Sequence, residues 1–114
     1  MNFDNVEAGT IEEVPYERKW GQEQITDWAQ KEFGNPDALA TAKRMKKEVE
    51  ELITHLEEGE LNEAAEECCD VEIMLRQVAT LVWVNLDQGV DQKMEVNVKR
   101  KWERTEEGDF QHVD

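Results

Sequence analysis

The chain has 114 residues, enough for one domain with a single core and too few for separate catalytic and binding domains. Its formal charge of −15 repels phosphate backbones and anionic lipids, which argues against nucleic-acid or membrane binding by the whole surface. The two cysteines, Cys68 and Cys69, are adjacent, and with two histidines they support neither a disulfide framework nor a zinc cluster. The N-terminal segment lacks the features of a signal peptide and no apolar run is long enough to span a membrane, so a soluble intracellular protein is expected.

The chain opens with an acidic segment and a first helix. Residues 1–18 show no sustained hydrophobic period, which predicts an extended or flexible arm. A one-sided apolar stripe from Trp20 to Phe33 then predicts a helix that Gly34 ends.

Capping residues place the second helix. Asn35 offers an N-cap and Pro36 suits the first helical position, so the second helix is expected to run from there to about Glu58, with Gly59 closing it.

Two further helices are predicted after that break. Asn62 can cap the third helix, which continues to about Val84. Asn85, followed three residues later by Gln88, resembles a capping box that opens a fourth helix reaching about Glu103 or Arg104.

Four helices with short connections and no alternating strand pattern predict an all-α fold, a four-helix antiparallel bundle. The predicted bundle covers residues 19–104, after the irregular arm of residues 1–18. A short tail of residues 105–114 has one turn signal at Gly108 and Asp109 and is expected to lie along the surface.

Four carboxylates have a helical phase that points them towards the core. Glu67 falls inside the apolar stripe of the third predicted helix and Asp70 lies beside it, while Glu48 and Glu51 flank the stripe of the second. Converging buried carboxylates need a compensating cation, and a divalent metal is the most compact one. The alternative is a set of solvated helix faces, because a chain with 28 acidic residues contains many such pairs by chance.

The fourth predicted helix carries a basic row. Lys93, Asn97 and Arg100 follow i, i+4, i+7 spacing and border an apolar stripe, so they also face inward. Such a row beside inward carboxylates can hold divalent cations next to a polyphosphate. The alternative is that Lys93 and Arg100 form structural ion pairs with the acids, although buried ion pairs are seldom a net gain in stability.

The order of these groups resembles a known family. Glu48-x-x-Glu51, Glu67-x-x-Asp70 and the row on the fourth helix, with Trp102 closing that helix, are similar to the MazG-like all-α nucleoside triphosphate pyrophosphatases. The segments KKEVEEL, AEECCDVEIML, QKMEVNVKRKW and GDFQHV look most like the phage and bacterial dATP/dGTP pyrophosphohydrolases.

The resemblance implies Mg²⁺-dependent hydrolysis of a (deoxy)nucleoside triphosphate, expected to be dGTP or dATP, to the monophosphate and pyrophosphate. It also implies that Mn²⁺ can replace Mg²⁺ and that the active form is a homodimer or homotetramer. The expected location is the cytoplasm, that of the host if a phage encodes the chain. The metal ligands would be Glu48, Glu51, Glu67 and Asp70, with Glu48 or Glu51 as general base. The phosphates would be bound by Lys93, Asn97 and Arg100.

The nucleotide base could stack on Trp20 or Trp28, although ordinary core or rim packing is the more common role of a tryptophan. Glu72 and Trp83 depart from the family pattern, where a smaller or apolar residue and a glycine-like turn are expected.

Two other classes of function remain open. One is a non-catalytic acidic helical module that binds a basic protein partner, for which the carboxylates would have to lie outside. The other is a metal-binding bundle with different chemistry, which the absence of histidine from the acidic pairs disfavours for a di-iron design.

Overall fold

The computed structural model describes residues 16–34 and 37–113. It divides into two compact units, Met1–Val84 and Asn85–Asp114, and each is described by itself. The predicted arm lies mostly outside the described residues, as do Asn35 and Pro36. The division into arm, bundle and tail stays a prediction.

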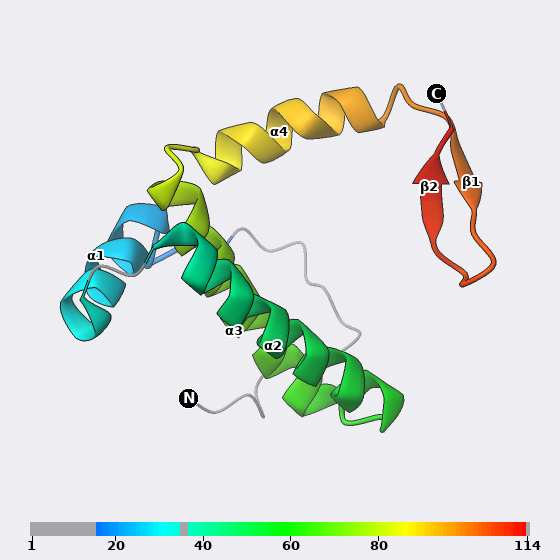
Figure 1. Ribbon diagram of the computed structural model, residues 1–114. Helices are drawn as coiled ribbons and strands as arrows, with labels where there is room; N and C mark the ends of the chain where they lie inside the picture. The colour runs from blue at the N-terminus through cyan, green and yellow to red at the C-terminus, as the bar shows by residue number, and fades with distance from the viewer. Residues whose placement is uncertain (1–15, 35–36, 114) are drawn as a thin grey trace. The chain divides into compact units, whose positions relative to one another are not determined.

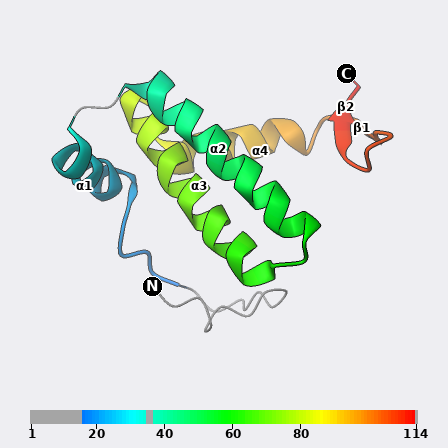
Figure 2. The ribbon, with the colours of Figure 1, turned by 60° about the horizontal axis from the view of Figure 1, so that its bottom comes forward.

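In the part of the first unit that the structure describes, the helices are α1 (Gln22–Phe33), α2 (Ala38–Glu57) and α3 (Leu61–Leu81) (Figure 1). α2 and α3 lie side by side in both views, joined by a tight turn at Gly59, whose φ of 72° suits glycine (Figures 1 and 2). A connection this short makes the two helices antiparallel neighbours.

α1 packs on the C-terminal half of α3. The Thr26 and Thr80 hydroxyls lie 3.0 Å apart, and the Gln22 amide donates to the Val84 carbonyl at 2.5 Å. The buried apolar residues of the described part come from these two helices: Ile25, Ala29, Ala64, Met74 and Ala79. The core is small, and it fixes the orientation of α3 on which the site depends.

The helix starts in this unit differ from the predicted ones. α2 begins at Ala38 because Asp37 is its N-cap, with a carboxylate that accepts from the Ala40 amide at 2.6 Å. The predicted cap at Asn35 was therefore wrong. α3 begins at Leu61 directly after the Gly59 turn, so Asn62 lies inside the helix rather than capping it.

The end of α3 also corrects the prediction. The helix stops at Leu81, not Val84, because Trp83 adopts a left-handed backbone with a φ of 63°. Trp83 is 95% exposed, so packing does not offset this strained conformation. The glycine-like turn that the family pattern implies at this position is thus formed by a tryptophan.

The second unit contains α4 (Leu86–Asn97) and a two-stranded antiparallel sheet of β1 (Trp102–Arg104) and β2 (Phe110–His112) (Figure 1). The side-chain oxygen of Asn85 accepts a hydrogen bond from the backbone N–H of Gln88 at 3.0 Å, which confirms the predicted cap. The predicted end at Glu103 or Arg104 was wrong, since the helix ends at Asn97.

Trp102 therefore does not close a helix. Its indole N–H donates to the Asn97 carbonyl at 3.0 Å, and its ring meets the edge of His112, its partner across the sheet. Within the predicted tail, Phe110–His112 form the exposed strand β2, which pairs with β1 through a turn in which Gly108 has a φ of 86°. The four helices and two three-residue strands of the described residues nevertheless confirm the all-α class. None of the described helices has the length and apolar character to cross a membrane.

Candidate metal centre between α2 and α3

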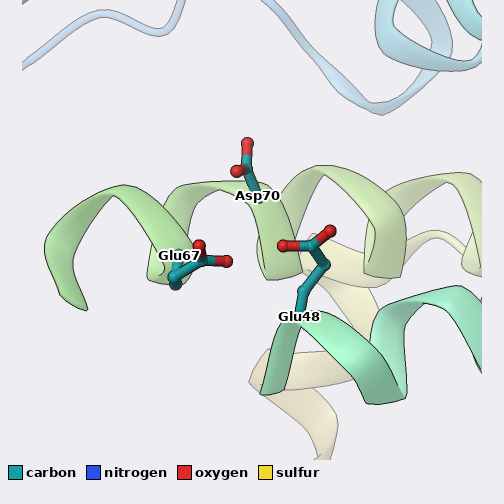
Figure 3. A group of neighbouring side chains, drawn as sticks. All are labelled: Glu48, Glu67 and Asp70. Carbon is teal, nitrogen blue, oxygen red and sulfur yellow. The ribbon is translucent and has the colours of Figure 1, made fainter. Parts of the chain in front are cut away.

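Three of the four predicted carboxylates converge. Glu48 projects from α2, and Glu67 and Asp70 project from successive turns of α3 (Figure 3). One carboxylate oxygen from each lies within 4.8 Å of the other two. The convergence follows from two local facts: i, i+3 spacing puts Glu67 and Asp70 on one face of α3, and the antiparallel neighbour α2 brings Glu48 opposite them.

Glu67 has the most perturbed environment. A side-chain hydrogen bond with Glu48, burial, and the negative charges of Glu48 and Glu51 together raise its pKa to about 7. Its Oε2 is buried and has no hydrogen-bond partner among the described residues. The other oxygen, Oε1, lies 4.0 Å from Nε2 of His55, whose Nδ1 is 3.3 Å from a Glu60 oxygen.

Asp70 shows the same trend more weakly. Burial raises the pKa of its carboxyl, the charges of Glu48 and Glu66 add to the effect, and the Arg44 guanidinium opposes it. Two crowded carboxyls with raised pKa values show that the protein alone does not neutralise this cluster.

This donor set fits a divalent cation. It offers hard carboxylate oxygens from two rigid helices, and one of those oxygens, Oε2 of Glu67, is buried without a partner. A cation would remove the repulsion between the carboxylates and favour their ionised forms.

Glu51 lies at the edge of this cluster. It is exposed on α2 and falls outside the group of three, yet its charge contributes to the raised pKa of Glu67. Its assignment as metal ligand or general base stays a prediction.

The basic row belongs to the second unit. Lys93 and Asn97 lie on α4, whereas Arg100 follows the helix in a turn in which its amide donates to the Asn97 carbonyl at 3.1 Å. The predicted continuous helical face through all three was therefore wrong, because α4 ends at Asn97. Phosphate binding by these residues stays a prediction.

The two candidate tryptophans line different cavities. Trp28 lines a cavity of about 270 Å³ together with Phe33, Arg44, Asp70 and Gln77. This cavity therefore shares Asp70 with the carboxylate cluster. Base stacking on either tryptophan stays a prediction, but Trp28 is the one whose cavity includes a cluster residue.

Trp20 lines a separate cavity of about 400 Å³. Glu72 lies in its wall and accepts from Nε of Arg76 at 2.9 Å and from the Arg18 guanidinium at 3.0 Å. These bonds lower the pKa of Glu72, with Arg76 as the larger cause. The acidic residue that departs from the family pattern is thus part of an ion-pair network.

Sequence reasoning missed Arg44 and Gln77. Each could have been found by helical spacing, because Arg44 precedes Glu48 by one turn and Gln77 follows Asp70 by two. A lone polar residue near an apolar stripe gives no further indication of a ligand.

The fold and the carboxylate cluster define the class as an all-α protein with a candidate divalent-metal centre between two antiparallel helices. No protein-family model matches the chain. It is 34% identical over 108 residues to a dATP/dGTP diphosphohydrolase of Salmonella phage PMBT28, an alignment that covers 93% of this chain and 32% of the relative. The chain thus spans about a third of the length of that curated relative.

A solved structure resembles the fold closely. The MazG-like pyrophosphohydrolase of cyanophage S-2L, bound to dGDP and three catalytic Mn²⁺ ions per active site, aligns with a TM-score of 0.69 at 25% identity. The alignment covers 82% of this chain and 93% of that one. The chain is thus similar in fold to a MazG-like pyrophosphohydrolase and in sequence to part of a dATP/dGTP diphosphohydrolase.

Proposed function

We propose that this protein hydrolyses a deoxynucleoside triphosphate, dGTP or dATP, to the monophosphate and pyrophosphate in a reaction that depends on Mg²⁺, with Mn²⁺ able to substitute. The observation that carries the proposal is the convergence of Glu48, Glu67 and Asp70 within 4.8 Å. The phage diphosphohydrolase and the dGDP-bound, Mn²⁺-containing cyanophage enzyme support the same activity by similarity.

The three converging carboxylates would hold the cation. When bound, a divalent ion of this kind lowers the pKa of a water and offsets the negative charge of the phosphates and of the leaving pyrophosphate. Water adds to the α-phosphorus, the bond from that phosphorus to the bridging oxygen of the β-phosphate breaks, and pyrophosphate departs.

The attacking water must give up a proton. Glu48 or Glu51 can accept it, and Glu51 is the better candidate because it lies outside the group of three while its charge still reaches Glu67. Glu51 is exposed, so the accepted proton can pass to solvent after each turnover.

Two further parts of the substrate, the base and the β- and γ-phosphates, have candidate contacts. The cavity that shares Asp70 with the cluster extends to Trp28, whose ring would stack on the base. The β- and γ-phosphates would be bound by Lys93, Asn97 and Arg100. The positive side chains of Lys93 and Arg100 would neutralise phosphate charge, and the side-chain amide of Asn97 would donate a hydrogen bond. A homodimer or homotetramer is proposed as the active assembly.

Pyrophosphate release from the four deoxynucleoside triphosphates and GTP, measured with Mg²⁺, with Mn²⁺ and with EDTA, tests the proposal. We expect metal-dependent pyrophosphate release, with kcat/KM highest for dGTP or dATP. Orthophosphate as the product would overturn the reaction, and equal kcat/KM for purines and pyrimidines would overturn the substrate. Absence of hydrolysis with every nucleotide would favour the acidic binding module instead.

A further inference from the structure

The cavity beside the carboxylate cluster is built from two parallel rows of side chains. On α3 the row runs from Asp70 through Met74 to Gln77, and on α2 Thr41 and Arg44 line the opposite wall. Asp70 and Gln77 are seven residues apart, so they lie on the same helix face and are separated by about 10 Å along the axis. One end of the cavity is therefore at the candidate metal centre, and Gln77 lies at the other.

Gln77 is an unusual residue for that position. It is 8% exposed, and it lines the cavity. Its side-chain amide forms no hydrogen bond with the residues that the structure describes, and its polar atoms are not among the fully buried unpaired ones, so the amide opens into the cavity. The hydroxyl of Thr41, which also lines the cavity, instead donates to the Asp37 carbonyl at 3.1 Å. The amide of Gln77 is thus available to a ligand that enters the cavity.

We propose that Gln77 determines base specificity by hydrogen bonding to the edge of the nucleotide base while the phosphates lie at the carboxylate cluster. The inference rests on the proposed function for the position of the phosphates. The orientation of the nucleotide follows from the cavity. A nucleotide with its phosphates at Asp70 and its base against Trp28 extends along α3 towards Gln77.

The chemistry of the amide suits this role. A glutamine side chain presents a donor and an acceptor side by side, the arrangement that pairs with adjacent polar groups on a base edge. Stacking on Trp28 is similar for all bases and so discriminates little between them. A base that leaves the buried amide unpaired is rejected strongly, so selectivity should depend on Gln77 more than on the aromatic wall.

Gln77→Met tests the proposal, since methionine is unbranched, of similar length and unable to make these hydrogen bonds. The substrates are dATP, dGTP and the triphosphate of purine 2′-deoxyriboside, which lacks exocyclic groups. In the wild type we expect kcat/KM for the preferred purine to exceed that of the unsubstituted purine by about 10- to 100-fold. In Gln77→Met, kcat/KM for the preferred purine should fall to within a few fold of kcat/KM for the unsubstituted purine. The value for the unsubstituted purine should change little.

A matched control is Gln30→Met, the same substitution at an exposed position of α1, which should keep the wild-type ratio. Gln77→Leu provides a second apolar variant if methionine does not yield folded protein. Helical content by circular dichroism identifies the folded variants.

A wild-type ratio in a folded Gln77 variant would overturn the role of Gln77 and leave the pyrophosphohydrolase intact. Calorimetric binding of α,β-methylene analogues of the same nucleotides separates the two proposals, because it requires no turnover. If the wild type hydrolyses nothing, a purine preference in binding that disappears in Gln77→Met still supports the inference. Identical binding by the two proteins overturns it.

Discussion

Glu67→Gln offers the sharpest test of the metal centre, because the amide keeps the volume of the side chain and removes its charge. The pKa of Glu67 is raised from 4.5 to about 7, and each tenfold change in proton affinity corresponds to about 1.4 kcal/mol. The ionised side chain therefore destabilises the metal-free protein by at most about 3 kcal/mol. Because the folded-state pKa is the higher one, the stabilising effect of the proton is complete below pH 4.5 and is lost as the pH rises through about 7.

Urea unfolding in EDTA at pH 5 and pH 8 measures this effect. At pH 8 Glu67→Gln should be more stable than the wild type by up to about 3 kcal/mol, and at pH 5 the difference should fall below about 1 kcal/mol. Added Mg²⁺ should reverse the order at pH 8, since the wild type gains stability by binding the ion and the variant does not. The variant should also lose metal-dependent turnover.

Glu50→Gln is the matched control, since Glu50 is an exposed residue of α2 outside the group of three. It should show neither the pH-dependent gain in EDTA nor the loss of the Mg²⁺ response. A stability difference between wild type and Glu67→Gln that is the same at both pH values would show that the pKa of Glu67 is not raised in the folded protein. An undiminished response of Glu67→Gln to Mg²⁺ would remove Glu67 from the metal centre.

Three further predictions concern the rest of the chain. Removing residues 1–18 should leave Mg²⁺ binding by calorimetry unchanged, because none of the converging carboxylates lies there and the lost Arg18–Glu72 ion pair is exposed and worth at most about 1 kcal/mol; weaker binding would show that the arm contributes to the centre. Trp83→Gly should raise the free energy of unfolding by about 0.5–1 kcal/mol, because glycine relieves the left-handed backbone and the exposed ring has little packing to lose; a decrease would mean that the ring is covered in the active assembly. Trp102→Ala should speed amide hydrogen exchange across Trp102–Arg104 and Phe110–His112, because the indole bond to Asn97 and the ring contact with His112 are lost; unchanged exchange would contradict this role.

Much of the fold could be predicted because it depends on local regularities. Apolar residues at helical spacing located all four helices, and the Asn85 cap was confirmed because a side-chain oxygen accepting from the amide three residues later is a purely local interaction. Helix ends were less predictable. Trp83 gives no compositional indication that it takes a backbone that glycine prefers, and Asp37 competes with Asn35 as a cap of equal chemical quality.

The hairpin was missed for a related reason. Its strands are three residues each, too short to show a period of two, and the lysine-rich segment before Trp102 has a good helix propensity. The indole bond to Asn97 and the pairing with His112 are non-local, so no pattern along the chain reports them.

The candidate site was predictable where it follows from helical phase. Glu48, Glu67 and Asp70 converge because their phases relative to the apolar stripes point between α2 and α3. Glu51 has nearly the same phase as Glu48 and yet lies outside the group, since small differences in rotation and depth decide which carboxylate reaches the cluster. Such differences depend on how two helices pack and are not recorded in either sequence segment.

The short turn at Gly59 has a consequence for how the protein folds. It joins the two helices that carry the carboxylates, so the cluster forms as soon as this helical hairpin closes, through contacts that are close in sequence and cost little loop entropy. In the absence of a cation, the same closure brings negative charges together and is opposed by their repulsion. A divalent ion should therefore increase the rate of folding and leave the rate of unfolding nearly unchanged, if the hairpin is formed in the transition state. The concentration of free metal would then govern how quickly newly synthesised chains acquire their structure.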